Sequence, residues 1–410
     1  MLLDLLSRYF FNKLAACFLS GSQPVTGASQ NDIFGQMKRC ILICLALLTA
    51  ACSSRPADRL FIGTYTGTGS DGIYTCTFSA ERGELGALTL AAKTANPSFL
   101  TFAQSGKFLY AVNELGEFNG ESSGAVNAFE VDRTNGALTL LNQVPSHGGA
   151  PCHVSLDRSE KFLFVANYSG GSIAVLPVNT DGQLGHATSI IQFQGSGKDS
   201  VRQQSPHAHF VQSTPDNRFV LVVDLGTDRI MIFRFDASTG ELTRNSPPHA
   251  DLEPGAGPRH LVMTPSGTTI FVLNELNSTI TRFDWDAPSG AMTKGETVST
   301  LPPDFTGPNT AAEILIDSQG KFIYASNRGH DSIVRAAIDT DGKLSVKDWT
   351  PSGGQAPRHI GIDPSGRWLF ASNQRSDVIA LFKIDATSGA LTQSPASVKV
   401  ASPVCVRFKP

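Results

Sequence analysis

Residues 258–275 read PRHLVMTPSGTTIFVLNE, and residues 357–374 read PRHIGIDPSGRWLFASNQ. Each stretch begins with alternating apolar and polar residues, passes through a Pro-Ser-Gly turn, and continues as a more apolar run that ends near Asn. Alternation with a period of two indicates a strand with one buried face, and a Gly-containing turn between two such runs indicates an antiparallel hairpin. The stretch therefore predicts a pair of antiparallel strands that occurs more than once in the chain.

Further copies of this hairpin lie along the chain, and an apolar third segment follows each of them. In one copy the third segment is DRIMIFRF and the next turn is DASTGELT. The copies recur at a spacing of roughly 50 residues with four short strands in each unit, which is typical of a β-propeller. These further copies begin at Pro97, Pro151, His207 and Ala311.

The two ends of the chain complete one another. Residues 402–408, SPVCVRF, form a lone first strand, whereas RLFIGTYTG from Arg59 and DGIYTCTF from Asp71 match the second and third strands. We expect an all-β, seven-bladed β-propeller of four-stranded antiparallel blades. Its C-terminal strand completes the blade begun by the N-terminal strands and leaves no free sheet edge. The equivalent third residues of the first strands are expected to be Phe99, His153, His209, His260, Glu313, His359 and Cys405.

Composition supports this architecture and excludes some partners. The chain contains 38 glycines, 23 prolines and 25 phenylalanines, which suits many short strands joined by tight turns. The net charge is −3 and no basic run is present, so we expect no nucleic-acid partner. Body cysteines Cys76, Cys152 and Cys405 lack the spacing of a metal or disulfide site, and we expect neither a metal nor another cofactor.

The N-terminal region resembles a bacterial lipoprotein signal. From Met37 the chain reads MKRCILICLALLTAACSS, a basic start followed by an apolar run and small residues before Cys52. We interpret residues 1–52 as an upstream extension plus this signal, with Met37 as the true start and cleavage before a lipidated Cys52. Residues 53–58 are then a short tether and residues 59–410 a single propeller domain, held at the periplasmic side of a bacterial membrane. The alternative is that Met37 is internal and the whole N-terminus is an anchor.

Several motifs resemble the lactonase family of seven-bladed propellers, typified by bacterial 6-phosphogluconolactonase. They are FIGTYTG, RQQSPHAH, GAGPRHL, LNELNSTI, ASNRGHDSI and GQAPRHI, and the likeness extends from Arg59 to Pro410. The resemblance implies hydrolysis of a sugar δ-lactone. A related fungal branch forms lactones from carboxylated muconate, so the resemblance implies lactone chemistry more firmly than one substrate. A secretory signal also places the chain where a phosphorylated sugar lactone is not expected.

The propeller geometry predicts where side chains meet. The first strand of a blade lines the central channel and the second runs antiparallel to it, so the start of the first and the end of the second share one end of the blade. All these pairs are expected at one mouth of the channel. The expected neighbours are Arg259 and His260 with Glu275, Glu313 with Arg328, Arg358 and His359 with Gln374, and His153 with Tyr168.

Lactone opening needs an activated water and a stabilised oxyanion. We expect Glu275 or His209 to activate the water, and Arg259 and Arg328 to hold the oxyanion or an anionic substituent. Residues 195–209 form a Gly/Ser-rich loop that leads to the same mouth and can act as an anion clamp. The residues expected to bind substrate are His153, His260, Arg202, His207, Arg358 and His359.

Purely structural interpretations remain open for the same residues. The repeated histidines can be buried residues that bond neighbouring loops, and residues 195–209 can be a surface loop. Arg328 can pair with Asp331, and Glu275 can be a surface carboxylate that pairs with Arg259. The corresponding alternatives to a lactone hydrolase are a non-catalytic, membrane-tethered binding propeller and a muconate-type cycloisomerase.

Overall fold

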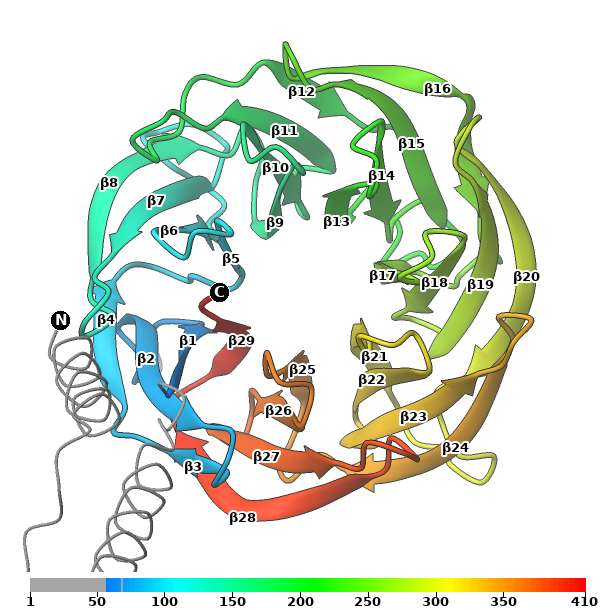
Figure 1. Cartoon of the computed structure of the whole chain (residues 1–410). Helices are drawn as coiled ribbons and strands as arrows, with labels where there is room; N and C mark the ends of the chain where they lie inside the picture. The colour runs from blue at the N-terminus through cyan, green and yellow to red at the C-terminus, as the bar shows by residue number, and fades with distance from the viewer. Residues whose placement is uncertain (1–56, 68) are drawn as a thin grey trace, which may run out of the picture. The chain divides into compact units, whose positions relative to one another are not determined.

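The computed structural model describes residues 57–67 and 69–410, and these residues form a ring of seven antiparallel sheets around a central channel (Figure 1). This confirms the predicted seven-bladed propeller. The proposed start at Met37, the cleavage before Cys52 and most of the tether lie outside the described residues. Within the described residues, no helix has the length and apolarity needed to cross a membrane.

Blades 1 to 4 are formed as follows. Blade 1 contains β29 (Pro403–Phe408), β1 (Asp58–Thr64), β2 (Gly72–Ser79), β3 (Glu84–Leu85) and β4 (Thr89–Lys93). Blade 2 contains β5 (Leu100–Phe102), β6 (Phe108–Asn113), β7 (Ala125–Val131) and β8 (Leu138–Pro145). Blade 3 contains β9 (Pro151–Leu156), β10 (Phe162–Asn167), β11 (Ser172–Pro177) and β12 (Ser189–Gln192). Blade 4 contains β13 (Ala208–Ser213), β14 (Phe219–Asp224), β15 (Arg229–Asp236) and β16 (Glu241–Asp251).

The other three blades repeat the same order from the channel outward. Blade 5 contains β17 (Pro258–Met263), β18 (Thr269–Asn274), β19 (Thr279–Asp286) and β20 (Ala291–Ser299). Blade 6 contains β21 (Thr310–Ile316), β22 (Phe322–Arg328), β23 (Ser332–Ile338) and β24 (Leu344–Pro351). Blade 7 contains β25 (Pro357–Ile362), β26 (Trp368–Asn373), β27 (Val378–Ile384) and β28 (Leu391–Lys399).

The turn between the first two strands is fixed by its own side chains. In blade 7, Asp363 Oδ1 accepts the backbone N–H groups of Arg367 (2.8 Å) and Trp368 (2.7 Å). Gly366 occupies the left-handed region at φ 71°, where a residue with a Cβ is disfavoured. The Asp-Pro-Ser-Gly sequence thus determines the turn that sends the chain back along the first strand.

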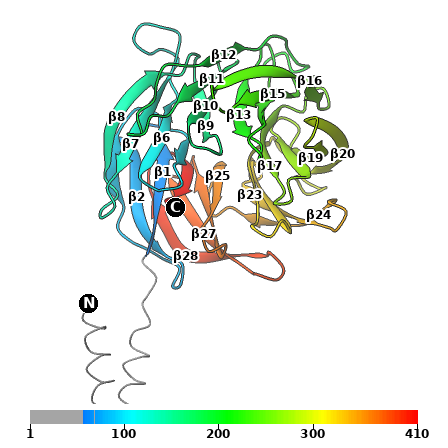
Figure 2. The same cartoon turned by 45° about the horizontal axis from the view of Figure 1, so that its top comes forward.

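Closure of the ring joins the two ends of the propeller. Strand β29 pairs antiparallel with β1, and Ile62 lies opposite Val406. The views in Figures 1 and 2 both place the C-terminus beside the first blade. Phe78 of blade 1 packs edge-on against Trp368 and Phe370 of blade 7, with ring centroids 5.9 and 4.9 Å away. The prediction that the C-terminal strand completes the first blade is confirmed.

The inner strand of most blades carries a β-bulge near its start, and this corrects one predicted register. In blade 5, Pro258 lies opposite Asn274 and His260 opposite Leu273, so Arg259 is the extra residue. In the same way, the extra residue in blade 7 is Arg358 and in blade 4 it is His209. His209 is therefore equivalent to Arg259, not to His260 as predicted. Phe210 therefore occupies the channel position of blade 4. The sequence HAHF (residues 207–210) does not by itself reveal this shift by one residue.

Candidate active site

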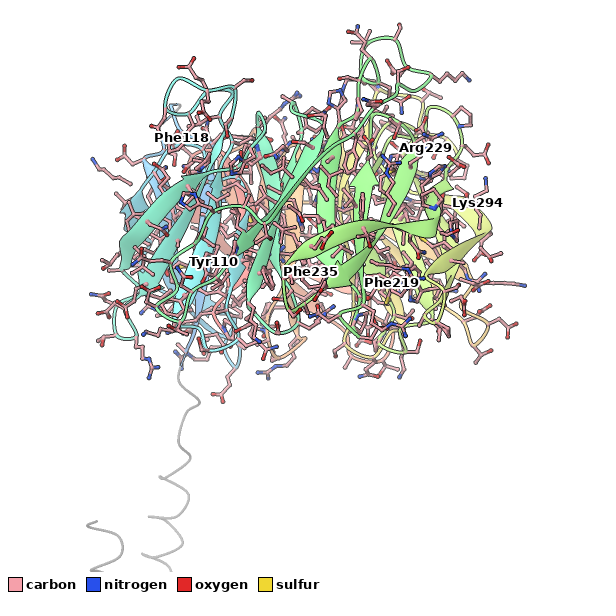
Figure 3. The ribbon with its side chains drawn as sticks, turned by 90° about the horizontal axis from the view of Figure 1, so that it is seen from above. Tyr110, Phe118, Phe219, Arg229, Phe235 and Lys294 are labelled. Carbon is pink, nitrogen blue, oxygen red and sulfur yellow. The ribbon has the colours of Figure 1, made fainter. Side chains whose placement is uncertain are left out.

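Two sets of side chains meet at one end of the channel, here called the mouth. One set consists of the bulge residues of the inner strands, and the other follows the Asn, Asp or Thr near the end of each second strand. In the side view of Figure 3, Arg229 lies near the edge that carries the mouth and Phe219 near the opposite edge. The second set is Tyr65, Glu114, Tyr168, Leu225, Glu275, Arg328 and Gln374.

Backbone anchors hold the bulges in place. Asp228, in the turn after β14, accepts the N–H of Gly257 at 2.7 Å, immediately before Pro258 and Arg259. Asp331, after β22, accepts the N–H of Ala356 at 2.8 Å in the equivalent place before Arg358. An anchor in the preceding blade therefore fixes the entry of the inner strands of blades 5 and 7, and with it the direction of Arg259 and Arg358.

Buried asparagines anchor the ends of the second strands. The Asn327 side chain donates to Thr300 O at 2.8 Å, which ties blade 6 to the loop after the outer strand of blade 5. Asn373 makes the same bond to Ser352 O at 3.0 Å between blades 7 and 6. The repeated Asn of the sequence is thus structural, and it positions the functional residue that follows it.

Glu275 lies at the centre of an arginine cluster, which consists of Arg202, Arg259 and Arg328. Its Oε1 is 2.6 Å from Arg202 Nη2, and its Oε2 is 3.1 Å from Arg259 Nε and 2.9 Å from Arg328 Nη2. The Glu275 side chain is 5% exposed, so solvent screens these charges only weakly. The predicted proximity of Arg259 and Glu275 is confirmed, and Arg328 pairs with Glu275 rather than with Asp331.

The cluster determines the protonation state of the carboxylate. Burial alone would raise the pKa of Glu275, but Arg328, Arg259 and Arg202 outweigh burial and lower it to about 2. Burial and the neighbouring guanidinium groups of Arg358 and Arg328 lower the pKa of Arg259 to about 10. At neutral pH Glu275 is therefore ionised, both of its oxygens are occupied by cations, and Arg259 remains charged.

Arg202 reaches this cluster from the loop of residues 195–207, which is anchored. The buried side chain of Gln203 donates to Leu225 O (2.8 Å) and to Asp228 Oδ1 (2.7 Å). Arg202 Nη2 also donates to Tyr168 Oη at 3.1 Å. The His207 ring stacks on Tyr168 with centroids 4.4 Å apart, and its Nδ1 lies 2.9 Å from Tyr168 O. The loop thus holds a guanidinium over the mouth, while His207 supports the tyrosine.

Arg358 lies across the same mouth, and no described carboxylate lies within ion-pair distance of it. Its guanidinium carbon is 5.2 Å from the centroid of the Tyr65 ring, and it forms no ion pair with any described residue. Tyr65 Oη donates to Glu114 Oε1 and Oε2 at 3.0 and 2.9 Å, and Ser98 Oγ donates to the same carboxylate. The sequence interpretation missed Tyr65 and Glu114, although their places after second strands match that of Glu275.

His209 presents an imidazole that has no side-chain hydrogen-bond partner among the described residues. Its ring packs 5.5 Å from Tyr168 and 5.2 Å from His260, and its Nδ1 is buried and unpaired. Burial, followed by the charge of Arg259, lowers the pKa of His209 well below its ordinary value. The side chain is therefore neutral at neutral pH, with a ring lone pair that no protein group occupies.

Three of the predicted substrate-binding histidines lie deeper, inside the channel. His153, His260 and His359 are 3, 2 and 1% exposed. His153 packs between Phe99 and Phe210 with tilted rings, the centroids 4.2 and 4.4 Å away. The expectation that they reach the mouth is corrected, because the bulge residues occupy that level and the residues after the bulge point to the channel axis.

Glu313 also lies in the channel rather than beside Arg328. Its Oε1 is 3.0 Å from His260 Nδ1, and its Oε2 is 3.6 Å from His359 Nε2. Arg328 instead donates to Ala311 O at 3.2 Å. The expected Glu313–Arg328 pair is not formed, because two residues, Ala312 and Glu313, lie opposite Ser326 in a bulge that turns the glutamate inward.

A cavity opens at each end of the channel. The cavity at the mouth has a volume of about 750 Å³ and is lined by Arg328, Arg358, Asn309 and Gln374 among others. The cavity at the opposite end, about 610 Å³, is lined by apolar side chains together with His153, Glu313, Arg158 and Arg407, and both arginines are bonded to backbone carbonyls. At the mouth, Arg358 and free donor atoms of Arg328 adjoin the arginine cluster, and we therefore place the candidate site there.

The charges at the mouth favour an anionic or strongly polarised ligand. The guanidinium groups of Arg202, Arg259, Arg328 and Arg358 face the carboxylates of Glu275 and Glu114, which leaves an excess of two positive charges. Guanidinium forks bind carboxylate, phosphate or a developing oxyanion. Across the described part of the chain, no three His, Cys, Asp or Glu side chains are grouped as a metal site requires.

Known proteins share this architecture. The sequence profile of the family described as Lactonase, 7-bladed beta-propeller matches residues 59–408. The 6-phosphogluconolactonase of Bacillus subtilis (strain 168) is 35% identical over 349 residues, 85% of this chain and 97% of that protein. An uncharacterised protein of Lactococcus lactis is also 35% identical, over 85% of this chain and 98% of its own length. The structure of the periplasmic gluconolactonase of Pseudomonas aeruginosa is similar with a TM-score of 0.81 and 32% identity, over 86% of this chain and 99% of that one.

Proposed function

Because the chain belongs to the family of seven-bladed β-propeller lactonases, we propose that it hydrolyses a sugar δ-lactone at the mouth of its channel. The observation that carries the proposal is the convergence of three guanidinium groups on buried Glu275, with unpaired Arg358 beside them. Positive charge fixed in a poorly solvated site stabilises the oxyanion that forms when water attacks an ester carbonyl.

The roles follow from which groups remain free. Arg259 and Arg328 each have donor atoms that Glu275 does not occupy, and they polarise the lactone carbonyl. His209 accepts a proton from the attacking water, because its imidazole is neutral and unpaired. Attack forms the tetrahedral oxyanion; its collapse breaks the ring C–O bond, and the released alkoxide takes up a proton to give the hydroxy acid. Glu275 holds the arginines in place, since both of its carboxylate oxygens are already occupied by guanidinium groups.

Arg358 and Arg202 are assigned to substrate binding. Arg358 is the better placed for an anionic substituent, because it lines the mouth cavity and forms no ion pair with a described residue. His207 supports this site through Tyr168, and the channel histidines lie beneath it. A phosphate or carboxylate on the lactone would therefore lie over blades 6 and 7, with the reacting carbonyl nearer to Glu275.

The test is hydrolysis of 6-phosphogluconolactone and of gluconolactone by the purified full chain, with spontaneous hydrolysis subtracted. We expect acceleration of at least one lactone, and a loss of about 100-fold or more in Glu275→Gln and Arg328→Ala. Arg229→Ala removes an exposed arginine on the same face but outside the mouth and should leave the rate unchanged. No acceleration with either lactone would exclude the proposal. Ligand binding without turnover would favour a binding propeller, and loss of muconate absorbance would favour a cycloisomerase.

We also propose that the protein acts in the cell envelope, attached through Cys52. The signal-like sequence before Cys52 supports this, and the similar Pseudomonas protein is named as periplasmic. Labelling with radioactive palmitate should mark the chain and fail in Cys52→Ala. Equal labelling of the two proteins would exclude lipidation at this residue. An envelope location would favour the non-phosphorylated lactone as the physiological substrate.

A further inference from the structure

A series of polar contacts runs from the arginine cluster into the channel. Arg259 Nη1 lies 3.4 Å from His260 Nε2, and His260 Nδ1 lies 3.0 Å from Glu313 Oε1. Glu313 Oε2 is 3.6 Å from His359 Nε2, and His359 Nδ1 accepts the N–H of Val406 at 3.3 Å. Glu313 and the two histidines are each at most 5% exposed.

The two ends of this series determine the donors and acceptors of its hydrogen bonds, whereas Glu313 Oε2 and His359 Nε2, 3.6 Å apart, form no hydrogen bond. A guanidinium only donates, so His260 Nε2 must be an acceptor and its proton must lie on Nδ1. That proton is directed at Glu313, which therefore accepts it. From the other side, the Val406 N–H makes His359 Nδ1 an acceptor, which places the second imidazole proton on Nε2, facing Glu313 Oε2. Both imidazoles are neutral and each has one consistent tautomer.

We propose that Glu313 is a positioning residue for the reaction, acting on Arg259 through His260. This rests on the proposed function. Arg259 is 3% exposed and lies close to the positive charges of Arg328 and Arg358. Because three arginines share the single negative charge of Glu275, a buried cation at Arg259 needs a further negative charge nearby. Glu313 supplies that charge from below, and His260 transmits the orientation of the carboxylate to Nη1 of the guanidinium.

The packing of the channel does not itself require a carboxylate at this position. The equivalent residues of other blades include Phe99, Phe210 and Cys405, which fill the same level of the channel with apolar groups. A carboxylate appears in blade 6, next to the blade that carries Arg259 and His260. This coincidence favours a role directed at Arg259 over a role in packing.

The proposal predicts a coupling that a packing role would not produce. In the full chain, Glu313→Gln should lower kcat for the accepted lactone by about 10-fold to 100-fold and change KM by less than about twofold, because the oxyanion contact is made in the transition state. In the Arg259→Lys variant, the additional substitution Glu313→Gln should lower kcat hardly any further. Cys405→Ala alters the same channel level but leaves Glu313 and the backbone N–H of Val406 in place, and kcat should be unchanged.

An independent measurement needs neither activity nor a variant. The ¹⁵N shifts of the His260 ring in the wild-type protein should show the Nδ1-protonated neutral tautomer. An Nε2-protonated ring would overturn the proposal, as would a loss of less than about twofold in Glu313→Gln or fully additive losses in the double variant. If the wild-type protein hydrolyses no lactone, the proposed function fails. The ¹⁵N shifts of the His260 ring still decide whether His260 donates to Glu313 and accepts from Arg259.

Discussion

Arg259 and Glu275 lie at the same end of one blade, with Nε of the arginine 3.1 Å from Oε2 of the glutamate. One is the bulge residue of β17 and the other directly follows β18, so the hairpin alone brings them together. Arg202 and Arg328 join this pair from a loop and from the next blade. The cluster is thus a local hairpin contact completed by tertiary structure.

The Glu275 carboxylate should make stability depend on acid pH. Its pKa is about 2 in the folded protein against an ordinary 4.5, so the stabilisation is fully present above pH 4.5 and is lost as pH falls towards 2. A shift of this size corresponds to about 3 kcal/mol. Urea unfolding at several pH values should show Glu275→Gln less stable at pH 7 and the difference shrinking below pH 4.5. Exposed Glu241→Gln is the control, and a difference that is independent of pH would contradict the prediction.

The neutral state of His209 should appear in the pH dependence of the rate. Because burial and Arg259 lower its pKa well below 6.5, kcat/KM should stay level between pH 6 and pH 8 after subtraction of spontaneous hydrolysis. His209→Asn should lower kcat by about 100-fold or more. His249→Asn, on an outer strand, should have no effect. An acid limb with an apparent pKa near 6.5 in the wild-type protein would argue against His209 as the base.

Arg358 should discriminate between charged and neutral lactones. Arg358→Ala should raise KM for 6-phosphogluconolactone by about 10-fold to 100-fold, because a bidentate contact to the anion is lost, and should leave the kinetics of gluconolactone nearly unchanged. Arg358→Lys should recover only part of this effect, since an ammonium lacks the planar fork. Steady-state kinetics with the two substrates decide the question, with Arg229→Ala as control. Equal losses for both substrates would assign Arg358 to the reacting carbonyl instead.

Closure by β29 should be essential to the ring. Removal of residues 403–410 leaves β1 as an exposed edge and uncovers the apolar side chains of Leu60 and Ile62. We expect the truncated protein to aggregate, because a free and apolar edge strand pairs with other chains. Soluble yield and light scattering measure this, with deletion of Pro410 alone as control. A soluble, monomeric truncated protein would show that the remaining blades hold the ring closed.

The sequence by itself determined the blades, their number and their closure. Period-two alternation, Asp/Gly turns and the complementary ends are local signals, and each acts within a few residues. The antiparallel pairing of the first two strands of a blade also predicted that Arg259 lies beside Glu275. It could equally have revealed Tyr65 and Glu114, because their positions in the repeat are the same.

Only the tertiary structure decided which side chains face the mouth and which face the channel axis. A single extra residue in an inner strand reverses the face of everything after it, and nothing in HAHF shows that the bulge falls on His209 and not on the residue before it. For the same reason Glu313 turns inward to His260 and leaves Arg328 to Glu275. The charges that set the pKa of Glu275 come from three different segments, and their sum exists only once the ring has closed.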